Sequence, residues 1–551
     1  MADKYTIGID YGTLYARGII VNINTGEQIA ESILKYPHGV MEELNGKKLP
    51  PDWALQHPQD YLDAMYSIIP DLIKKSSVNK NDIVGIGVDF TSCTILPVKA
   101  DGRPLCFLPE YKDNPHAYVK LWKHHAAQYC ADKLNKTAEE SSEKWLSLYG
   151  GKISSEWLVP KVMQIVKEAE DIYYAADKII EAGDWIVWKL CGKEARSACN
   201  AGYKAIWQHY QGYPSEEFFT KLDNRLKNLV EDKLSTDIKP LGSRAGYISK
   251  ETADKTGLST KTAVSVGIID AHASLPACRI ADEGKLLMIM GTSTCHIILS
   301  RKELSVPGIC GIVKDGVLPG FYAYEAGQSC VGDHFSWFTE NCMPEHYIEE
   351  AKKQGVTQYR YISDKASRLK AGESGLLALD WWNGVRSVLM DFDLSGMIIG
   401  MTLATKPEEI YRALIEATAY GTRMIIEAFE KAGLKVNELY AAGGIAVKDR
   451  LIMQIYSDIC NRNIKVTEST QSGALGSAIY AVAAAQYEEN CNNDMNDIIN
   501  RLGKAEKSVF TPNKNNVPIY NDIYIEYKKL HDYFGKNNDT MKILKRIKIN
   551  A

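Results

Sequence analysis

The chain has 551 residues and a formal net charge of −4, from 65 lysines and arginines against 69 aspartates and glutamates. This near balance argues against a dedicated nucleic-acid-binding protein, which needs a cationic surplus. Hydrophobic residues make up 45% and charged residues 24%, so the composition is globular and argues against a fibrous or wholly disordered chain. The length predicts two large domains or three to four smaller ones.

No apolar run reaches the roughly 18–20 residues that cross a bilayer, and no secretory hydrophobic region follows the first methionine. Twelve cysteines are dispersed from Cys93 to Cys491, and no two have the C-x-x-C spacing of a zinc knuckle or a redox motif. We therefore expect a reduced, cytoplasmic protein that contacts neither a membrane nor nucleic acid.

The first part of the chain has the pattern of an α/β domain. Residues 5–23, YTIGIDYGTLYARGIIVNI, contain two β-rich runs around a polar turn, which predicts a β-hairpin. Residues 59–75 repeat Leu, Met and Ile at helical spacing, and residues 82–98 form another β-rich run. Strands that alternate with helices predict an α/β fold.

The turn of this first hairpin is a candidate phosphate site. Gly12 lets backbone amides approach a phosphate closely, and the Thr13 hydroxyl adds a donor. Asp10 offers the oxygen ligands that Mg²⁺ prefers, and Arg17 can neutralise phosphate charge. The alternative is an ordinary hairpin in which Asp10 and Thr13 serve only the turn.

A domain boundary is expected between residues 256 and 284, where an apolar run ends in GIIDAH. Asp270 follows this run directly, and open α/β sheets place ligands at such strand ends. A carboxylate here can accept the proton of an attacking hydroxyl, and a helix N-cap role is compatible with that function. His272 has no second ligand at a useful spacing, so we expect it to be structural or adjacent to a substrate.

The second half of the chain opens like the first. Residues 285–300, KLLMIMGTSTCHIILS, again have the pattern of strand, turn and strand, with Gly291 and Thr292 in the turn. This recurrence predicts two related domains that face one another, so that the two hairpins grip a polyphosphate from both sides.

A further strand, LYAAGG at 439–444, is predicted to end in Gly443 and Gly444. Bare backbone there can lie against an adenine or a phosphate, and plain packing between strand and helix is the alternative. Helices are expected over 449–460 and, with small residues, over 471–485. The last fifty residues are polar and are expected to form a peripheral helix and tail.

Several nucleotide-binding motifs are absent. The sequence contains no G-x-x-x-x-G-K-[S/T] loop and no protein-kinase pair of H-R-D and D-F-G. Gly85 and Gly87 lack the third glycine of a dinucleotide-binding fingerprint, because Phe90 stands in its place. A nicotinamide dehydrogenase therefore loses support.

Taken together, the motifs resemble the FGGY family of carbohydrate kinases, whose domains share the ribonuclease-H-like fold of actin, Hsp70 and hexokinase. IGIDYGT, GTSTC and AAGGIAVKD occur in the family's order, and the similarity covers about residues 4–490. Several stretches are most similar to the family members that phosphorylate L-ribulose: VDFTSCTILPV, HAYVKLWKHHA, NAGYKAIW, DAHAS, GTSTCH, YEAGQSCVGD and LDWWNGVRS.

The resemblance implies two ribonuclease-H-like domains around a central cleft, over 1–270 and 271–500, followed by a helical extension over 501–551. It implies ATP- and Mg²⁺-dependent phosphorylation of L-ribulose at O5, as in L-arabinose breakdown, with the domains closing on the sugar. The family is compatible with a homodimer, although the sequence shows no interface signal.

The resemblance also implies roles for single residues, with Asp270 as the catalytic base and Asp10 as the metal ligand. The sugar pocket would contain Ser92, Trp122, Lys204, Asp270 and Glu325. The phosphates would be bracketed by Gly12, Thr13, Arg17, Gly291 and Thr292. The adenosine would meet Gly443, Gly444 and Lys448.

Some positions allow a plainer interpretation. Related glycerol kinases have a second hydroxyl residue after the threonine of the first hairpin, where this chain has Leu14, so a side-chain phosphate contact there is in doubt. Trp122 lies in a helix-like segment and could be core, and Lys204 and Glu325 could be surface charges. Two alternative functions stay open: another FGGY kinase, for xylulose, D-ribulose or ribitol, and a non-catalytic nucleotide-binding protein like actin or Hsp70.

Overall fold

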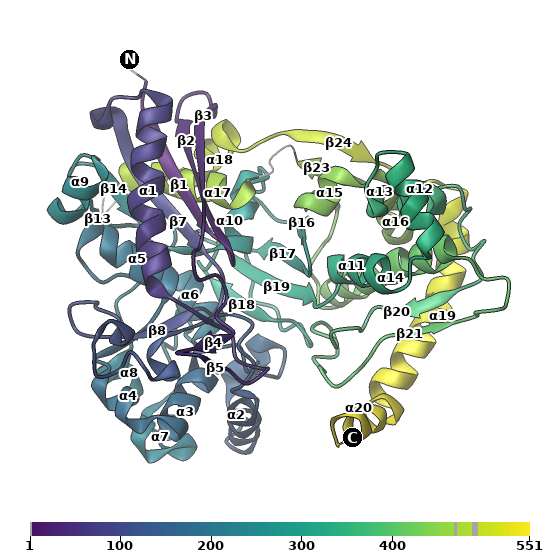
Figure 1. Cartoon of the computed structure of the whole chain (residues 1–551), viewed down its shortest axis with the longest axis horizontal. Coiled ribbons are helices and arrows are strands. Elements are labelled where there is room, and N and C mark those ends of the chain that lie inside the picture. Colours follow the sequence, from purple (N-terminus) through teal and green to yellow (C-terminus); the bar gives the residue numbers. More distant parts are fainter. Residues whose placement is uncertain (1–2, 468–470, 488–493, 551) are drawn as a thin grey trace.

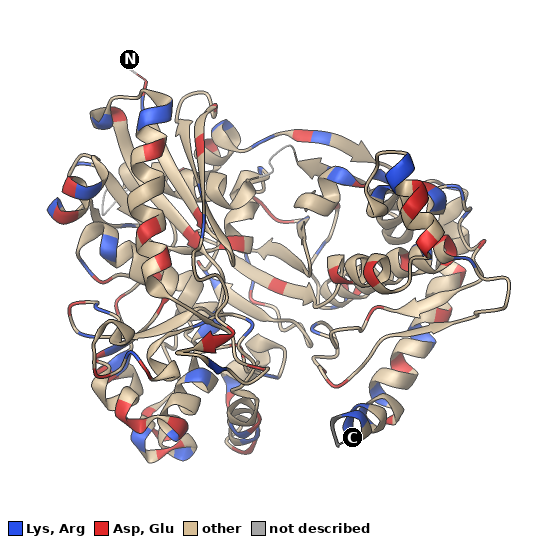
Figure 2. Cartoon of the chain, in the orientation of Figure 1, with Lys and Arg blue, Asp and Glu red and all other residues tan. Residues whose placement is uncertain are grey.

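The computed structural model describes residues 3–467, 471–487 and 494–550, without the side chains of residues 549 and 550. Two mixed seven-stranded sheets form the centres of the two halves of the molecule (Figure 1). Acidic and basic residues are interspersed over both halves (Figure 2). None of the helices in the described part of the chain is long and apolar enough to span a membrane.

The first sheet has the strand order β3-β2-β1-β7-β14-β13, with β15 also paired to β7. Strands β1 to β3 are antiparallel in succession, whereas β7 and β14 run parallel to β1. The expected hairpin is β1–β2, and the expected first helix is α1 (Pro58–Ser76). The strands are β1 (Tyr5–Tyr11), β2 (Tyr15–Asn22), β3 (Gln28–Lys35), β7 (Ile83–Phe90), β13 (Arg244–Tyr247), β14 (Ala263–Ser265) and β15 (Ile268–Ile269).

The second sheet repeats this plan. Its order is β19-β17-β16-β22-β23, extended by β18 at one edge and β24 at the other. Strands β16, β17 and β19 are antiparallel in succession, and β22 and β23 run parallel to β16. The internal repeat expected from the two hairpins is thus confirmed. The strands are β16 (Lys285–Met290), β17 (Thr294–Ser300), β18 (Gly311–Lys314), β19 (Tyr322–Gln328), β22 (Glu438–Ala442), β23 (Ile464–Thr467) and β24 (Glu506–Phe510).

Glycines on the first sheet let a helix from late in the chain pack directly on it. Helix α17 (Ser472–Ala485) crosses β1 and β7, and an ideal Cβ on Gly8 or Gly87 would lie 1.8 or 2.2 Å from a carbonyl oxygen of α17. A Cβ on Gly476 would similarly lie 1.7 Å from a carbonyl oxygen of α10 (Asp270–Ala277). Glycines in the VGIGVDF run therefore serve helix packing, and the small-residue helix connects the two halves.

A smaller sheet with its own hydrophobic core extends the first half. Its order is β10-β8-β9-β6, and helices surround it (Figure 1). Its strands are β6 (Leu55–Gln56), β8 (Ile95–Val98), β9 (Val119–Lys120) and β10 (Lys178–Glu181). Helices of this half include α2 (Gln128–Glu140), α3 (Leu158–Glu168), α4 (Glu170–Ala175), α5 (Ala182–Cys191), α6 (Ala198–Lys204), α7 (Glu216–Leu222), α8 (Leu229–Lys233) and α9 (Lys250–Thr256).

Helices also cover the second sheet, and the C-terminal segment packs against them. Helix α19 (Asn516–Lys536) contacts α16 and the strand β20 (Leu377–Leu379), which pairs with β21 (Met397–Ile399). The last helix, α20 (Thr540–Asn550), contains basic residues and no acidic ones. The other helices here include α11 (Gly332–Asn341), α12 (Glu345–Lys353), α13 (Gln358–Ala366), α14 (Pro407–Lys431), α15 (Gly444–Lys448), α16 (Arg450–Cys460) and α18 (Met495–Leu502). The described cysteines are free thiols, and Cys491 lies outside the described residues.

Candidate active site

Three carboxylates meet where β1, β7 and β15 end. Asp10 on β1 pairs in register with Asp89 on β7, and Asp270 begins α10 directly after β15. Asp89 is fully buried; its Oδ2 accepts a 2.7 Å hydrogen bond from Ser477, whereas Oδ1 has no partner among the described residues. An ideal Cβ on Gly473 would lie 3.1 Å from Asp89 Oδ1 and 3.4 Å from Asp10 Cγ. The first turns of α10 and α17 thus border the cluster, where the helix dipole favours negative charge.

Burial and mutual repulsion set the protonation of this cluster. Burial, and after it the charge of Asp10, raises the pKa of Asp270 to about 7. Burial also raises the pKa of Asp10, and burial together with the Asp10 charge raises that of Asp89 well above its ordinary value. Asp270 can therefore exchange a proton near neutral pH, whereas Asp10 and Asp89 form a pair in which a cation can take the place of a proton.

Asp89 was not among the expected site residues. The sequence contains a partial signal for it, because Asp89 ends the apolar run VGIGVD much as Asp10 ends the run IGID. That the two runs are parallel neighbours, with both carboxylates at the same end, is seen only in the fold. Arg17 stands opposite Asp10 on the antiparallel β2, and its charge lowers the pKa of Asp10 without overcoming the effect of burial.

The turn of the first hairpin contacts Trp122, a residue of the expected sugar pocket. The Gly12 N–H donates a 3.0 Å hydrogen bond to the carbonyl of Tyr15, and Thr13 Oγ1 accepts one of 3.1 Å from Trp122 Nε1. Trp122 lies in a turn after β9, so the helix-like interpretation of this segment is wrong. The reason is that the N–H of Leu121 bonds back to the carbonyl beside β6, which holds the chain extended up to the turn. The structure thus joins the turn of the first hairpin to Trp122.

A buried ion pair connects the two halves close to these carboxylates. Lys204, the last residue of α6, places Nζ 3.0 Å from Glu325 Oε2 on β19, and their side chains are only 5% and 7% exposed. Burial opposes both charges, but the opposite charge of the partner outweighs it, so the pKa of Lys204 is raised and that of Glu325 is lowered. Both charges also shift the pKa of Asp270, which Glu325 raises and Lys204 lowers. The two residues are therefore not surface charges, and they present fixed hydrogen-bonding groups beside Asp270.

Ser92 and Trp122 belong to segments that a buried lysine holds together. Ser92 follows β7 in a turn, and the next residue, Cys93, has a φ of 55°. Lys161 of α3 is fully buried and donates hydrogen bonds of 2.5 and 2.8 Å to the carbonyls of Cys93 and Leu121. Because these carbonyls adjoin Ser92 and Trp122, the ammonium group fixes both segments.

The second hairpin is fixed by the start of α11. The carbonyl of Gly291 accepts a 3.0 Å hydrogen bond from the N–H of Gly332, and that of Thr292 accepts one of 2.9 Å from Val331. The turn is therefore held in place, and within it the N–H of Gly291 donates a 2.9 Å hydrogen bond to the carbonyl of Ser293.

The paired glycines lie next to this hairpin. Gly443, with a φ of 97°, abuts β16, since a Cβ there would lie 2.4 Å from the carbonyl oxygen of Met290. A Cβ on Gly444 would have no atom of the described residues within 4 Å, so its backbone is open on this side. Lys448 ends the short helix α15 and is exposed. The glycines thus border the second hairpin, whereas Lys448 lies a helical turn further on.

A cavity of about 800 Å³, the cleft cavity, is lined by both halves. The first half contributes Trp122, and the second contributes Thr292. The C-terminal extension reaches it too, through Lys545 and Lys548 of α20. The second hairpin therefore borders the cleft cavity directly, whereas the first hairpin is connected to its wall through the hydrogen bond between Thr13 and Trp122.

His272 lies beside the ion pair and does not form a metal site. Its Nε2 is 3.2 Å from Glu325 Oε2, its Nδ1 is 3.1 Å from the sulfur of Cys199, and burial lowers its pKa. His272, Cys295 and Glu325 have ligand-type atoms within 4.8 Å of one another, but the Lys204 ammonium already neutralises the carboxylate. We assign His272 a structural position next to the expected sugar pocket.

Two sheets of the same topology around a shared cleft define a class of protein, and solved structures share it. A xylulose kinase from Lactobacillus acidophilus matches with a TM-score of 0.79 and 19% identity, over 97% of this chain and 99% of that one. A xylulose kinase from Rhodospirillum rubrum matches with a TM-score of 0.78 and 20% identity, over 96% and 98%. These likenesses establish a two-domain α/β fold.

Similarity in sequence identifies the family, whereas the solved structures above establish only the fold. Residues 5–276 and 286–485 match the N-terminal and C-terminal domains of the FGGY family of carbohydrate kinases. A ribulokinase from Bacillus licheniformis is 55% identical over 535 residues, 97% of each chain. A ribulokinase from Geobacillus thermodenitrificans is 51% identical over 555 residues, 100% of this chain and 98% of the relative. The chain belongs to the FGGY family of carbohydrate kinases, as its motifs predicted.

Proposed function

We propose that the chain is a ribulokinase that transfers the terminal phosphoryl group of ATP to the C5 hydroxyl of L-ribulose, in L-arabinose catabolism. The observation that carries this proposal is Asp270, a carboxylate with a pKa of about 7 beside the Lys204–Glu325 pair. The full-length similarity to ribulokinases supports the ketopentose as substrate.

Asp270 would act as general base. As the C5 oxygen bonds to the terminal phosphorus and the bond from that phosphorus to the leaving ADP oxygen breaks, the hydroxyl proton passes to Asp270. Lys204 and Glu325 would orient the sugar by hydrogen bonds, and Trp122 would cover it. Ser92 would border the sugar from its turn.

The hairpin backbones would hold the nucleotide. The N–H groups of Gly12 and Gly291 bond within their own hairpins and shape the two turns. The N–H groups of Thr13 and Thr292 would donate to phosphate oxygens from opposite sides, with Arg17 adding charge. The open backbone at Gly443 and Gly444 would lie against the adenosine, with Lys448 at its edge. Because phosphoryl transfer needs mainly positioning and charge stabilisation, rigid turns of this kind suit it.

The residues present fit a magnesium ion. Asp89 Oδ1 is a buried oxygen with no partner among the described residues, and Asp10 lies beside it. Carboxylate oxygens are the ligands this hard cation prefers, so Asp10 and Asp89 would hold it, directly or through its water molecules. When bound with ATP, the ion supplies charge neutralisation for the phosphates.

A substrate panel tests the proposal. ADP release is measured with L-ribulose, D-ribulose, L-xylulose, D-xylulose and ribitol, each at several concentrations. We expect the highest kcat/KM for L-ribulose. A higher value for another sugar would make the chain a different FGGY kinase, and ATP binding without sugar-stimulated ADP release would favour the non-catalytic alternative.

The proposal includes a cytoplasmic location, which the free state of the described cysteines supports. Its partners are the sugar and ATP. A homodimer is consistent with it, and sedimentation of the purified chain decides the oligomeric state.

A further inference from the structure

A second ion pair joins the two halves beside the Lys204–Glu325 pair. Arg386 Nη2 lies 3.4 Å from Oε2 of Glu156, a residue of the first half. Glu156 immediately precedes Trp157, whose ring centre is 5.6 Å from Lys204 Nζ. The polarity is reversed, because the first half supplies the cation of one pair and the anion of the other.

Arg386 lies on the same face of β19 as Glu325. An ideal Cβ on Gly327 would lie 2.9 Å from Arg386 Cδ and 3.3 Å from its Nη1. Residues two apart on a strand face the same side of the sheet, so the Arg386 side chain covers β19 next to Glu325. A side chain at position 327 would occupy this space.

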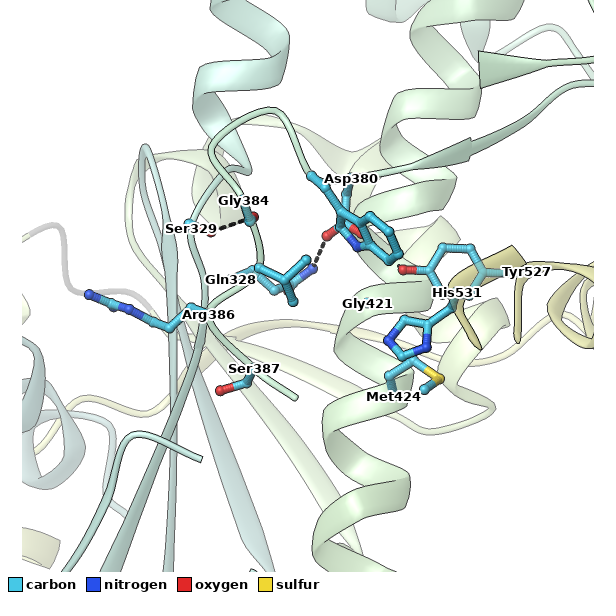
Figure 3. Close-up of a pocket in the computed structure, with 12 residues that line it drawn as sticks. Gln328, Ser329, Asp380, Gly384, Arg386, Ser387, Gly421, Met424, Tyr527 and His531 are labelled. Carbon is cyan, nitrogen blue, oxygen red and sulfur yellow. Dashed lines mark hydrogen bonds between the residues drawn. The ribbon is translucent and has the colours of Figure 1, made fainter. Parts of the chain in front are cut away.

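The loop that carries Arg386 is anchored to β19 and α19 (Figure 3). The N–H of Ser387 donates a 3.0 Å hydrogen bond to the carbonyl of Gly327. At the start of the loop, Asp380 Oδ1 accepts a 2.9 Å hydrogen bond from the Tyr527 hydroxyl. In Figure 3 the Arg386 side chain points away from the cluster around Asp380. The guanidinium is therefore held in position before any ligand binds.

The second pair is open to the cleft cavity. Arg386 and Glu156 both line it, as Trp122 does, and their side chains are 25% and 10% exposed. Within the part of the chain that the structure describes, the bond to Glu156 is the only side-chain hydrogen bond of this guanidinium. An arginine has five N–H donors, and a carboxylate has about four acceptor sites, so the pair can bind neighbouring hydroxyl and carbonyl oxygens.

The neighbours of Glu325 tell which end of a sugar would reach this pair. Glu325 Oε2 lies 3.2 Å from Nε2 of His272, which is two residues after Asp270 on α10. Arg386 instead packs over Gly327, two residues further along β19 than Glu325. The Lys204–Glu325 pair therefore adjoins both the helix that carries Asp270 and the Arg386–Glu156 pair. Given the kinase activity proposed above, we propose that Arg386 and Glu156 bind the non-reacting end of the ketopentose, its C1 hydroxyl and C2 carbonyl, and thereby join both halves to the sugar.

The test combines protein variants with a substrate that lacks the group. Wild type, Arg386→Met and Glu156→Gln are assayed with L-ribulose and with 1-deoxy-L-ribulose, with KM for sugar, KM for ATP and kcat measured separately. Arg360→Met is the matched control, because Arg360 makes an exposed ion pair with Asp364 on α13, away from the cleft cavity. Glu156→Gln preserves the shape of the side chain, and thermal melting verifies that each variant is folded.

We expect each cleft variant to raise KM for L-ribulose about tenfold or more, as for the loss of a hydrogen bond to a charged group. KM for ATP should stay within about twofold of wild type. For wild type, KM for 1-deoxy-L-ribulose should exceed KM for L-ribulose by a similar factor. For the two cleft variants, the two sugars should have about the same KM. The inference would be overturned if the substitution and the missing C1 hydroxyl raised KM additively. It would also be overturned if a variant raised KM for ATP as much as KM for the sugar. If wild type turns over no ketopentose at all, the proposed function fails, and the inference fails with it.

Discussion

At the scale of single residues, the pKa shifts of the Lys204–Glu325 pair and of Asp270 fit the different roles proposed for them, sugar binding and proton transfer. Lys204 and Glu325 are buried as fully as core residues, yet each keeps its charge because the partner is 3.0 Å away. Among the described residues, no cation makes an ion pair with Asp270, and burial together with the charge of Asp10 raises its pKa to about 7. A permanently charged pair suits recognition, whereas a group that titrates near neutrality suits proton transfer.

Replacement of Asp270 tests this division. We expect Asp270→Asn to bind ATP like wild type and to lose about 10²–10⁴ in turnover, the usual contribution of a general base. In wild type, kcat/KM should rise with pH and level off above about 7, because only the deprotonated carboxylate accepts the proton. The measurement is a pH profile of kcat/KM with nucleotide binding measured in parallel. Near-normal turnover in Asp270→Asn would contradict the assignment. A wild-type kcat/KM that does not change with pH around 7 would contradict it as well.

The residues of the site were predictable to different degrees. Lys204 and Glu325 lie in separate motifs, and only the fold shows that they touch. Asp89 was missed because its role depends on the parallel register of β1 and β7, which the sequence does not state. Arg386 was missed for a similar reason, since its place depends on the space above Gly327.

At the scale of elements, alternation and turn residues were sufficient for the strands of both hairpins and for α1. The Trp122 segment was not predictable in this way, because residues with helical spacing follow a short strand whose partner, β6, is remote in sequence. The glycines of β1 and β7 also became interpretable only through α17, which is nearly 400 residues away from β7.

The contact between Gly8 and α17 leads to a stability prediction. Gly8→Ala should lower the free energy of unfolding by about 1–3 kcal/mol, since the new Cβ would meet backbone at 1.8 Å and a helix must move. Gly444→Ala is the control for stability, because its Cβ would have no atom within 4 Å. Denaturant unfolding measures both. Equal stability of the two variants would show that α17 does not rest on this glycine.

At the scale of the whole molecule, five strands of the same order and sense recur in both halves, and this repeat was visible in the sequence as two similar hairpins. What the sequence could not show is how the halves are joined. Helix α17 packs on the first sheet and on α10, and α10 also contacts β16 and β17 of the second sheet. The Lys204–Glu325 and Arg386–Glu156 ion pairs bridge the two halves as well. The C-terminal extension, expected to be peripheral, contributes Lys545 and Lys548 to the wall of the cleft cavity.

This construction predicts that the halves close further when both substrates are present. The cleft cavity, at about 800 Å³, is large for a sugar of ten heavy atoms, and an open site would let water compete with the C5 hydroxyl. Small-angle scattering should therefore show a smaller radius of gyration with L-ribulose and a non-hydrolysable ATP analogue together than with either alone. Hydrolysis of ATP without sugar should be far slower than phosphorylation. An unchanged radius, together with rapid sugar-independent hydrolysis, would mean that water is excluded by some means other than closure.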